Sequence, residues 1–271
     1  LGFTIAHIAP DQGIFRGQTG VISLSDQLNP INSSVAQVID FKYRAKKNRE
    51  YPRSLLGVIA HIRQTFYDSD WYLKAQEIVQ EYPSENEPIS SNSSLESLGL
   101  SRALNKPFVF ISSNDNSSSR AINIVKEFKL SPWILGSGYE YRVLDYFDEV
   151  KPFFIMPINF PAKPNVTKPM SDLQFSTREL KHWDMAPDNL LYLTNSEFDF
   201  SITSHGLKKK NDFRKNLQRI IERGLNKDIV LAGLTTQPAE ALGLEKSFGK
   251  IAKGYNANLV VVDGDYFDHK S

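Results

Sequence analysis

The chain has 271 residues, of which 41% are hydrophobic and 23% are charged, and it contains no cysteine. This composition excludes a disordered chain, disulfides and thiolate metal sites, and it predicts a soluble globular protein. The formal net charge is +1 and the longest basic run is three lysines, which excludes a surface of the kind that binds nucleic acid. No apolar run approaches the roughly 18 residues of a spanning helix, so we expect no membrane anchor within these residues.

The first residues predict where the chain stands in its parent protein. Leu1 is not an initiator Met, and a strand-like segment follows it at once. We therefore expect the natural N-terminus to lie upstream, together with a signal peptide or a first strand. Without cysteines to indicate the redox compartment, the location stays open between cytoplasmic and exported.

The first hundred residues predict two strands and one long helix. Apolar residues indicate strands at 3–9 and 21–24, with a glycine-containing loop at 11–20 between them and an exposed turn at 29–34. Residues 53–79 carry apolar side chains at spacings of three and four, which predicts an amphipathic helix. Prolines, serines and acids at 81–94 predict a mobile connection.

From residue 108 onward, short apolar strands alternate with helices. We expect strands at 108–112, 133–135, 153–156 and 198–203, and helices at 118–128, 139–147, 180–194 and 212–223. This alternation favours parallel βαβ units and a TIM-barrel-like (β/α)8 fold. Only six strands can be counted, so we expect an incomplete barrel. A further strand at 259–262 is expected outside it.

The C-terminal residues resemble a known family. Residues 234–244, LTTQPAEALGL, and 249–261, GKIAKGYNANLVV, resemble the amidohydrolase superfamily, particularly its imidazolonepropionase-like branch. In that family these segments form the last barrel helix and the return to a companion β-sandwich. The resemblance implies that residues 1–248 are an amidohydrolase-like barrel lacking its first strand. It also implies that residues 249–271 are the C-terminal part of the composite sandwich.

The resemblance also implies a chemistry. Amidohydrolases use one or two divalent metals, often zinc, to hydrolyse non-peptide carbon–nitrogen bonds. Their ligands are a His-x-His pair on the first strand, a middle-strand Lys or Glu, two further histidines and a late Asp. Ser112, Gly136 and Ser204 stand where histidine or aspartate is expected, and hydroxyls are poor zinc ligands. We therefore expect a degenerate metal site, no resident cofactor, and a binding or assembly role within a larger protein.

Two alternatives stay open at this point. The protein is an active metal-dependent amidohydrolase if the His-x-His strand lies upstream, or if the strand register brings Asp115, Glu140 or His205 into ligand positions. It is a subunit if its barrel face is buried against another chain. Whether the chain is an enzyme is therefore not decided by its sequence.

Polar residues at predicted strand ends and in the glycine-containing loop are candidates for a pocket. The candidates are Arg16, Gln18, Ser112, Glu140, Ser204 and His205. For Arg16 and Gln18 a solvated loop is an equally good interpretation, and His7, His61 and His269 are expected to be structural. Missing strands leave unpaired edges, so the expected partners are the remainder of the same polypeptide or a second copy, besides a small-molecule ligand.

Overall fold

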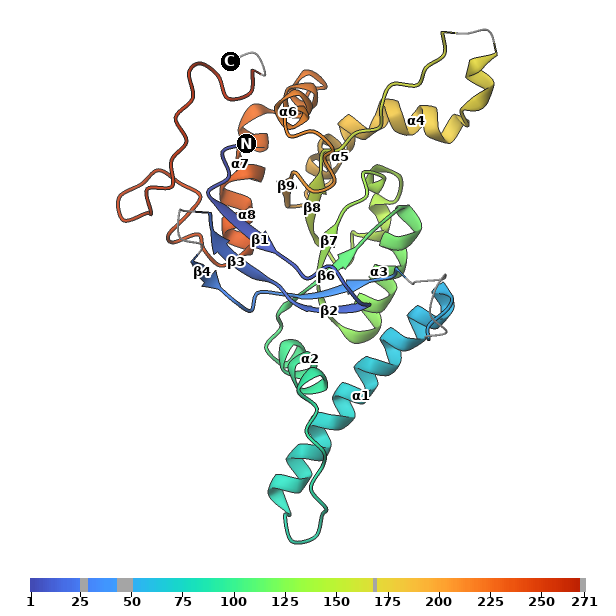
Figure 1. The fold of residues 1–271 in the computed structure, drawn as a ribbon, viewed down its shortest axis with the longest axis vertical. Helices are drawn as coiled ribbons and strands as arrows, with labels where there is room; N and C mark the ends of the chain where they lie inside the picture. Colours follow the sequence, from blue (N-terminus) through green and yellow to red (C-terminus); the bar gives the residue numbers. More distant parts are fainter. Residues whose placement is uncertain (25–28, 43–50, 168–169, 269–271) are drawn as a thin grey trace. The chain divides into compact units, whose positions relative to one another are not determined.

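The computed structural model describes residues 1–24, 29–42, 51–167 and 170–268, so His269 lies outside the described residues. The chain forms two compact units, whose helices and strands are labelled in Figure 1. The first unit comprises Leu1–Thr4, Ser112–Ser119 and Ile134–Ser271. The second comprises Ile5–Ile111 and Arg120–Trp133.

The second unit begins with antiparallel strands. β1 (Ile5–Ile8), β3 (Gly20–Ser23) and β4 (Pro30–Asn32) form a sheet in the order β1-β3-β4, and β2 (Phe15–Gln18) pairs with β5 (Gln37–Asp40). The strands expected at 3–9 and 21–24 are confirmed. The predictions of a loop at 11–20 and an exposed turn at 29–34 are wrong, because β2 and β4 lie within them. β2 and β4 pair through backbone hydrogen bonds, which do not depend on apolar side chains. Glycine and proline in these segments are typical of turns, so the sequence pattern did not indicate strands.

β5 pairs with one neighbour antiparallel and with the other parallel. All four of its residues are buried, and it runs parallel to β6 (Pro107–Ile111), with Val38 opposite Val109. The sequence analysis placed no strand here, because Gln37 and Asp40 interrupt the apolar run. Both are buried nonetheless.

Two helices follow β5 and pack against each other. α1 (Leu55–Glu81) is one continuous helix, as the spacing predicted, and begins at Ser54, whose hydroxyl accepts from the Gly57 amide. α2 (Ser93–Ala103) begins at Asn92 in the same way. The two helices approach closely at Gly99, where a Cβ atom would lie 2.5 Å from Leu73 Cδ1. Only glycine fits at this position without displacing Leu73.

The first unit contains the end of β7 (Ser131–Leu135), followed by β8 (Phe153–Pro157) and β9 (Phe200–Thr203), which are parallel to each other. These three strands confirm the predictions at 133–135, 153–156 and 198–203. Their core is aromatic: the Phe147, Phe154 and Phe198 rings meet edge to face at centroid distances of 5.0 to 6.1 Å. A helix, α3 (Asp115–Phe128), begins in this unit.

The remaining helices of the first unit are short. They are η1 (Glu140–Arg142), η2 (Leu144–Tyr146), η3 (Ser171–Gln174), α4 (Thr177–Met185), η4 (Ala186–Asp188), α5 (Asn189–Asn195), α6 (Asp212–Glu222), α7 (Lys227–Leu234) and α8 (Thr236–Ala241). The helix expected at 139–147 is two 3₁₀ turns, η1 and η2. The reason is the Glu140 side chain, which binds the backbone N–H groups of Ser137 and Gly138 and so holds a tight loop.

The segment from residue 249 to 268 contains no regular strand among the described residues. The strand expected at 259–262 is therefore wrong for this structure, since no neighbouring strand pairs with it there. The fold is α/β with parallel strand pairs, as predicted for an incomplete TIM-barrel-like hydrolase, and its described strands do not close into a barrel. No described helix is both long and apolar enough to cross a membrane.

Candidate functional site

The residues that directly follow four strands, β6 to β9, belong to the first unit. The Ser112 amide, just after β6, donates to Leu135 O at 3.0 Å, and the Gly136 amide donates to Ile155 O at 2.9 Å. β8 and β9 end together, with Pro157 opposite Thr203. Residues that follow these strands therefore share one edge, which is where α/β folds of this type place their sites.

Ser112 is closed off within its own loop. Its side chain is buried, and its Oγ lies 2.7 Å from Ser118 Oγ and 2.9 Å from Asn114 O. Both partners belong to the turn that begins α3. Ser112 therefore shapes the loop between β6 and α3.

Glu140 is the most deeply buried carboxylate of this edge, with none of its surface exposed. Its Oε1 accepts from Ser137 N at 2.6 Å and from Ser137 Oγ at 2.9 Å. Its Oε2 accepts from Gly138 N at 2.9 Å and from Asn189 Nδ2 at 2.8 Å. Four donors from the protein thus occupy both oxygens, which anchors η1 to the start of α5.

A second carboxylate, Asp115, lies between two arginines. Arg178 Nη2 donates to Asp115 Oδ1 at 2.9 Å, and Arg142 Nη1 lies 3.3 Å from Oδ2. Asp115 is buried at the first residue of α3, whereas both arginine side chains are partly exposed. Two guanidinium charges against one carboxylate leave a local surplus of positive charge. The sequence pattern did not single out either arginine, since the two are far apart in the chain.

His182 stands beside these arginines and was also missed by the sequence analysis. It lies one turn after Arg178 on α4, and its ring stacks on Tyr139 at a centroid distance of 3.5 Å. Its Nδ1 is buried without a hydrogen-bond partner. Burial, together with the charges of Arg142 and Arg178, lowers the pKa of His182 to about 4. The imidazole is therefore neutral at pH 7.

Ser204 and His205 follow β9, and within the described residues no hydrogen bond or ion pair joins them to this cluster. Ser204 is half-buried, and the His205 amide donates to Thr203 Oγ1 at 3.2 Å while its side chain is exposed. The next residue, Gly206, has φ of +75°, and a Cβ there would lie 2.6 Å from Asn159 Nδ2. The backbone conformation of Gly206 and its close approach to Asn159 therefore determine the loop. His205 remains a candidate site residue only because it follows β9.

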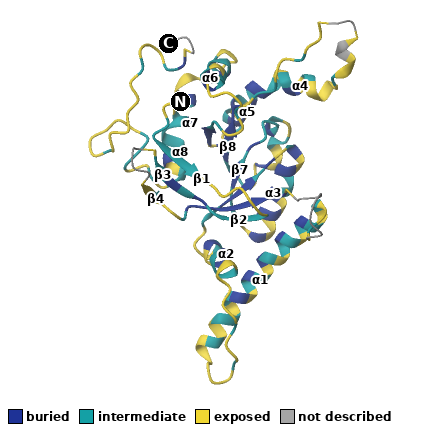
Figure 2. Ribbon diagram, viewed as in Figure 1, coloured by how far each residue is buried: buried dark blue, intermediate teal, exposed yellow. Residues whose placement is uncertain are grey.

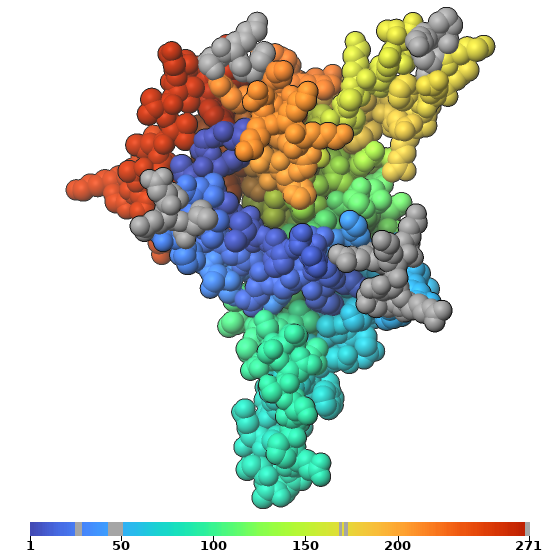
Figure 3. All heavy atoms as spheres, viewed as in Figure 1, coloured from blue at the N-terminus to red at the C-terminus, as the bar shows by residue number. Residues whose placement is uncertain are grey.

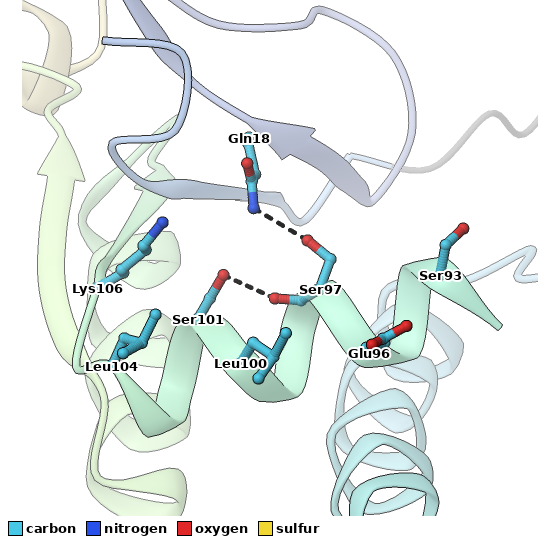
Figure 4. Close-up of a pocket in the computed structure, with 8 residues that line it drawn as sticks. All are labelled: Gln18, Ser93, Glu96, Ser97, Leu100, Ser101, Leu104 and Lys106. Carbon is cyan, nitrogen blue, oxygen red and sulfur yellow. Dashed lines mark hydrogen bonds between the residues drawn. The ribbon is translucent and has the colours of Figure 1, made fainter.

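Arg16 and Gln18 belong to the second unit. Arg16 of β2 forms an ion pair with Asp40 of β5, so its side chain stabilises the pairing of these two strands. Gln18 donates to Ser97 Oγ at 3.0 Å and lines a hollow of about 330 Å³ beside α2. Figure 4 shows Gln18 above the serine face of α2, with Leu100 and Leu104 along the same helix side and Lys106 at one end. The hollow is polar on one side and apolar on the other.

The divalent metal that the resemblance implies does not fit the donors at the strand ends. In the part of the chain that the structure describes, no group of three or more His, Asp or Glu side chains converges in a way that would hold an ion. The two buried carboxylates, Glu140 and Asp115, already bind protein donors through both oxygens. A metal would have to displace these donors and leave them unpaired, which costs about 1–3 kcal/mol for each buried donor.

Comparison with known proteins agrees with the fold. The model of the amidohydrolase family matches residues 199–270. An amidohydrolase from Thermotoga maritima MSB8 superposes with a TM-score of 0.76 at 20% sequence identity, over 98% of this chain and 68% of that one. A metal-dependent hydrolase from Pyrococcus furiosus has a TM-score of 0.46 at 15% identity, over 67% of this chain and 39% of that one.

A prolidase complexed with N-methylphosphonate-L-proline has a TM-score of 0.45 at 15% identity, over 83% of this chain and 60% of that one. None of the curated proteins matches the sequence. The narrower resemblance to imidazolonepropionase-like enzymes stays a prediction. The broader one is confirmed: residues 199–270 match the amidohydrolase family, and the chain has the fold of an amidohydrolase.

Proposed function

We propose that this chain is an amidohydrolase-like binding domain that holds a small anionic molecule without a metal ion on residues 112–205. One observation carries the proposal. Both buried carboxylates at the strand ends are occupied by protein donors, while the two partly exposed arginines beside them meet no second acid among the described residues. The guanidinium N–H groups that Asp115 leaves unused are hydrogen-bond donors, and such donors bind an anion and not a cation.

Arg142 and Arg178 supply the binding groups. A guanidinium carries five N–H donors in a planar fork, and each arginine directs one nitrogen at Asp115. The donors that remain match the oxygens of a carboxylate, which arginine binds through two parallel hydrogen bonds. Asp115 holds both guanidinium groups in place, so that little rotamer freedom is lost on binding.

The aromatic side of the cluster supports an organic anion. The Arg178 guanidinium lies 5.5 Å from the Tyr139 ring centroid, and the Tyr139 and His182 rings are stacked. The neutral imidazole adds no positive charge at pH 7, and its Nδ1, which has no hydrogen-bond partner, is buried. A small carboxylate with a flat amide or ring group has the matching chemistry.

Thermal unfolding tests the anion. N-acetylglycine and its neutral amide, N-acetylglycinamide, differ only in the carboxylate. We expect millimolar N-acetylglycine to raise the unfolding midpoint and the neutral amide to leave it unchanged, because a ligand stabilises only the state that binds it. Arg178→Met is expected to remove this shift, and Lys246→Met, an exposed cation elsewhere in the first unit, to keep it. Equal shifts by both compounds contradict the proposal.

Metal content tests the other half. Elemental analysis after dialysis against zinc-free buffer is expected to find far less than one zinc, iron or manganese per chain. About one metal per chain, lost in Glu140→Gln, would establish the alternative of an active metal-dependent hydrolase.

An assembly role rests on the C-terminal segment. Ile251 and Val261 are 90% and 96% exposed, within the stretch that matches the amidohydrolase family. Exposed apolar residues at such positions are typical of surfaces that another segment covers. We propose that a β-element outside these residues, from the same polypeptide or a second copy, covers residues 259–262. Hydrogen exchange of the 259–262 amides tests this proposal. Slow exchange in a longer polypeptide expressed from the parent gene, together with fast exchange in this chain, would support the proposal.

A further inference from the structure

The outer face of α1 is lined with large exposed side chains, of which Tyr67 also contacts the Phe128 ring at a centroid distance of 5.2 Å. Trp71 is 62% exposed, Tyr67 55%, Ile78 50% and Leu56 78%. The inner face is different: Val58, Ile62, Phe66, Ser69 and Tyr72 are all buried against the second unit. Figure 2 shows the two faces as alternating dark and yellow bands along the helix.

The exposed residues follow a coiled-coil spacing. Ala60, Gln64, Tyr67, Trp71, Lys74 and Ile78 are all exposed and recur at alternating steps of four and three. Such a step pattern keeps one stripe of a helix facing a partner helix along its length. We name these six residues the α1 seam. The helix has 27 residues, so it is about 40 Å long at 1.5 Å per residue.

The seam is complementary to itself when reversed. If two copies run antiparallel about an axis midway between Tyr67 and Trp71, at the level of Ser69, each Trp71 meets the partner's Tyr67. The same register places Ile78 against the partner's Ala60, a large side chain against a small one. Because the axis is twofold, every contact forms twice, as in isologous dimers. We infer that α1 docks on α1 of a second copy of this chain, antiparallel and in this register.

One charged residue of the seam favours the reversed register. It places Lys74 beside the partner's Gln64, a neutral side chain that donates to Asp68 of its own helix at 2.6 Å. On the flank of the seam, Arg63 lies level with the partner's Ala75, about 3 Å along the axis from the level of the partner's Glu77. A parallel arrangement would instead place each Lys74 against its own copy, and like charges at matched positions repel.

The other acid near the axis, Asp70, is already paired with Arg102 of α2. Arg63 also binds Glu127 of its own chain at 2.7 Å and keeps 43% of its side chain exposed. Any contribution of Arg63 to the dimer is therefore shared with its ion pair to Glu127. At the axis, Asp68 and Asp70 of one copy lie level with Asp70 and Asp68 of the other, and the Arg102 bound to Asp70 offsets part of their repulsion.

The area is sufficient for a specific dimer. A fully exposed aromatic side chain offers roughly 150–250 Å², so Trp71 and Tyr67 at their exposures present roughly 100 Å² each. With Ile78, Leu56 and the stems of the polar seam residues, two protomers bury more than the roughly 1,000 Å² that marks a specific interface. Figure 3 shows the atoms of α1 and α2 side by side within the second unit.

Sedimentation and light scattering across a concentration series test the docking surface. We expect a dimer in the micromolar range, and at least a tenfold weaker dissociation constant in Trp71→Glu. Tyr146→Glu is the matched control: it introduces the same charge at an aromatic residue of the first unit that is 57% exposed, and it is expected to leave the dimer intact. Circular dichroism checks that both variants fold.

Cysteine cross-linking tests the register, because the chain has no cysteine of its own. Ala60→Cys and Ile78→Cys are made as separate proteins. Oxidation of a mixture is expected to give a heterodimer, whereas neither protein alone cross-links, because equal positions lie about 27 Å apart at 1.5 Å per residue in the antiparallel register. A monomer at every concentration, a dimer lost in Tyr146→Glu but kept in Trp71→Glu, or efficient cross-linking of either protein alone overturns the inference. This inference does not depend on the proposed function, so either can fail alone.

Discussion

Replacing Glu140 by Gln tests whether this carboxylate is a structural acceptor. The side chain is fully buried, and every polar atom that contacts its oxygens within the described residues is a donor. Gln retains one oxygen but places an NH₂ group where the other oxygen was. Asn189 cannot turn its amide to compensate, because its Oδ1 already accepts from the Tyr141 amide at 2.7 Å.

The least costly arrangement puts the new NH₂ group beside Ser137. The Ser137 hydroxyl can rotate to accept from it, but the Ser137 N–H loses its acceptor, which costs about 1–3 kcal/mol for a buried donor. The hydrogen bonds that remain change from charge-assisted to neutral, which roughly halves their strength. Relief of the buried charge offsets part of this loss. We expect a net loss of about 2–3 kcal/mol, or about 4–12 °C in the unfolding midpoint for a domain of this size.

Thermal unfolding followed by circular dichroism measures the effect, with urea unfolding as a check on its size. Glu240→Gln makes the same chemical change at an exposed position of α8, and it is expected to change stability by less than about 0.5 kcal/mol. An unchanged midpoint in Glu140→Gln, together with loss of a bound metal, would refute the reasoning and identify Glu140 as a ligand.

The same unit gives three further predictions. The pKa of His182 is lowered from 6.5 to about 4 in the folded state, so the unfolded state binds more protons between these two pH values. Stability should therefore fall as the pH is lowered from about 6.5 to about 4. In urea titrations, His182→Gln should reduce this pH dependence. Asp115→Asn should lower stability by about 2 kcal/mol, because the two guanidinium groups lose the shared negative charge and one of them faces an NH₂ group in place of an oxygen, with exposed Asp145→Asn as the control in the same titration. Gly136→Ala should cost about 1–3 kcal/mol in thermal unfolding, because its Cβ would lie 2.5 Å from Met156 Sδ; an unaltered midpoint would show that Met156 moves freely.

Candidate site residues were predictable only where a strand end marks them. Ser112 and Glu140 were selected because they follow β6 and β7, and the structure places both at the same edge. Arg142, Arg178 and His182 carry no such signal, since they come from two helical segments that meet only at Asp115 and Tyr139 among the contacts described above. The one cue was the four-residue step from Arg178 to His182, which puts both on one face of α4.

The sequence alone determined the elements whose pattern is local. Apolar periodicity was enough for α1, β8 and β9, and the motif near the C-terminus was enough for the resemblance of residues 199–270 to the amidohydrolase family, because both depend on neighbouring residues. Tertiary structure decided what depends on distant partners: the pairing of β2 with β5, the loss of a strand at 259–262, and the use of Glu140 and Asp115 as acceptors. The physical reason is that a carboxylate looks the same in a sequence whether a metal or four protein donors hold it. Only the fold shows which donors reach its oxygens.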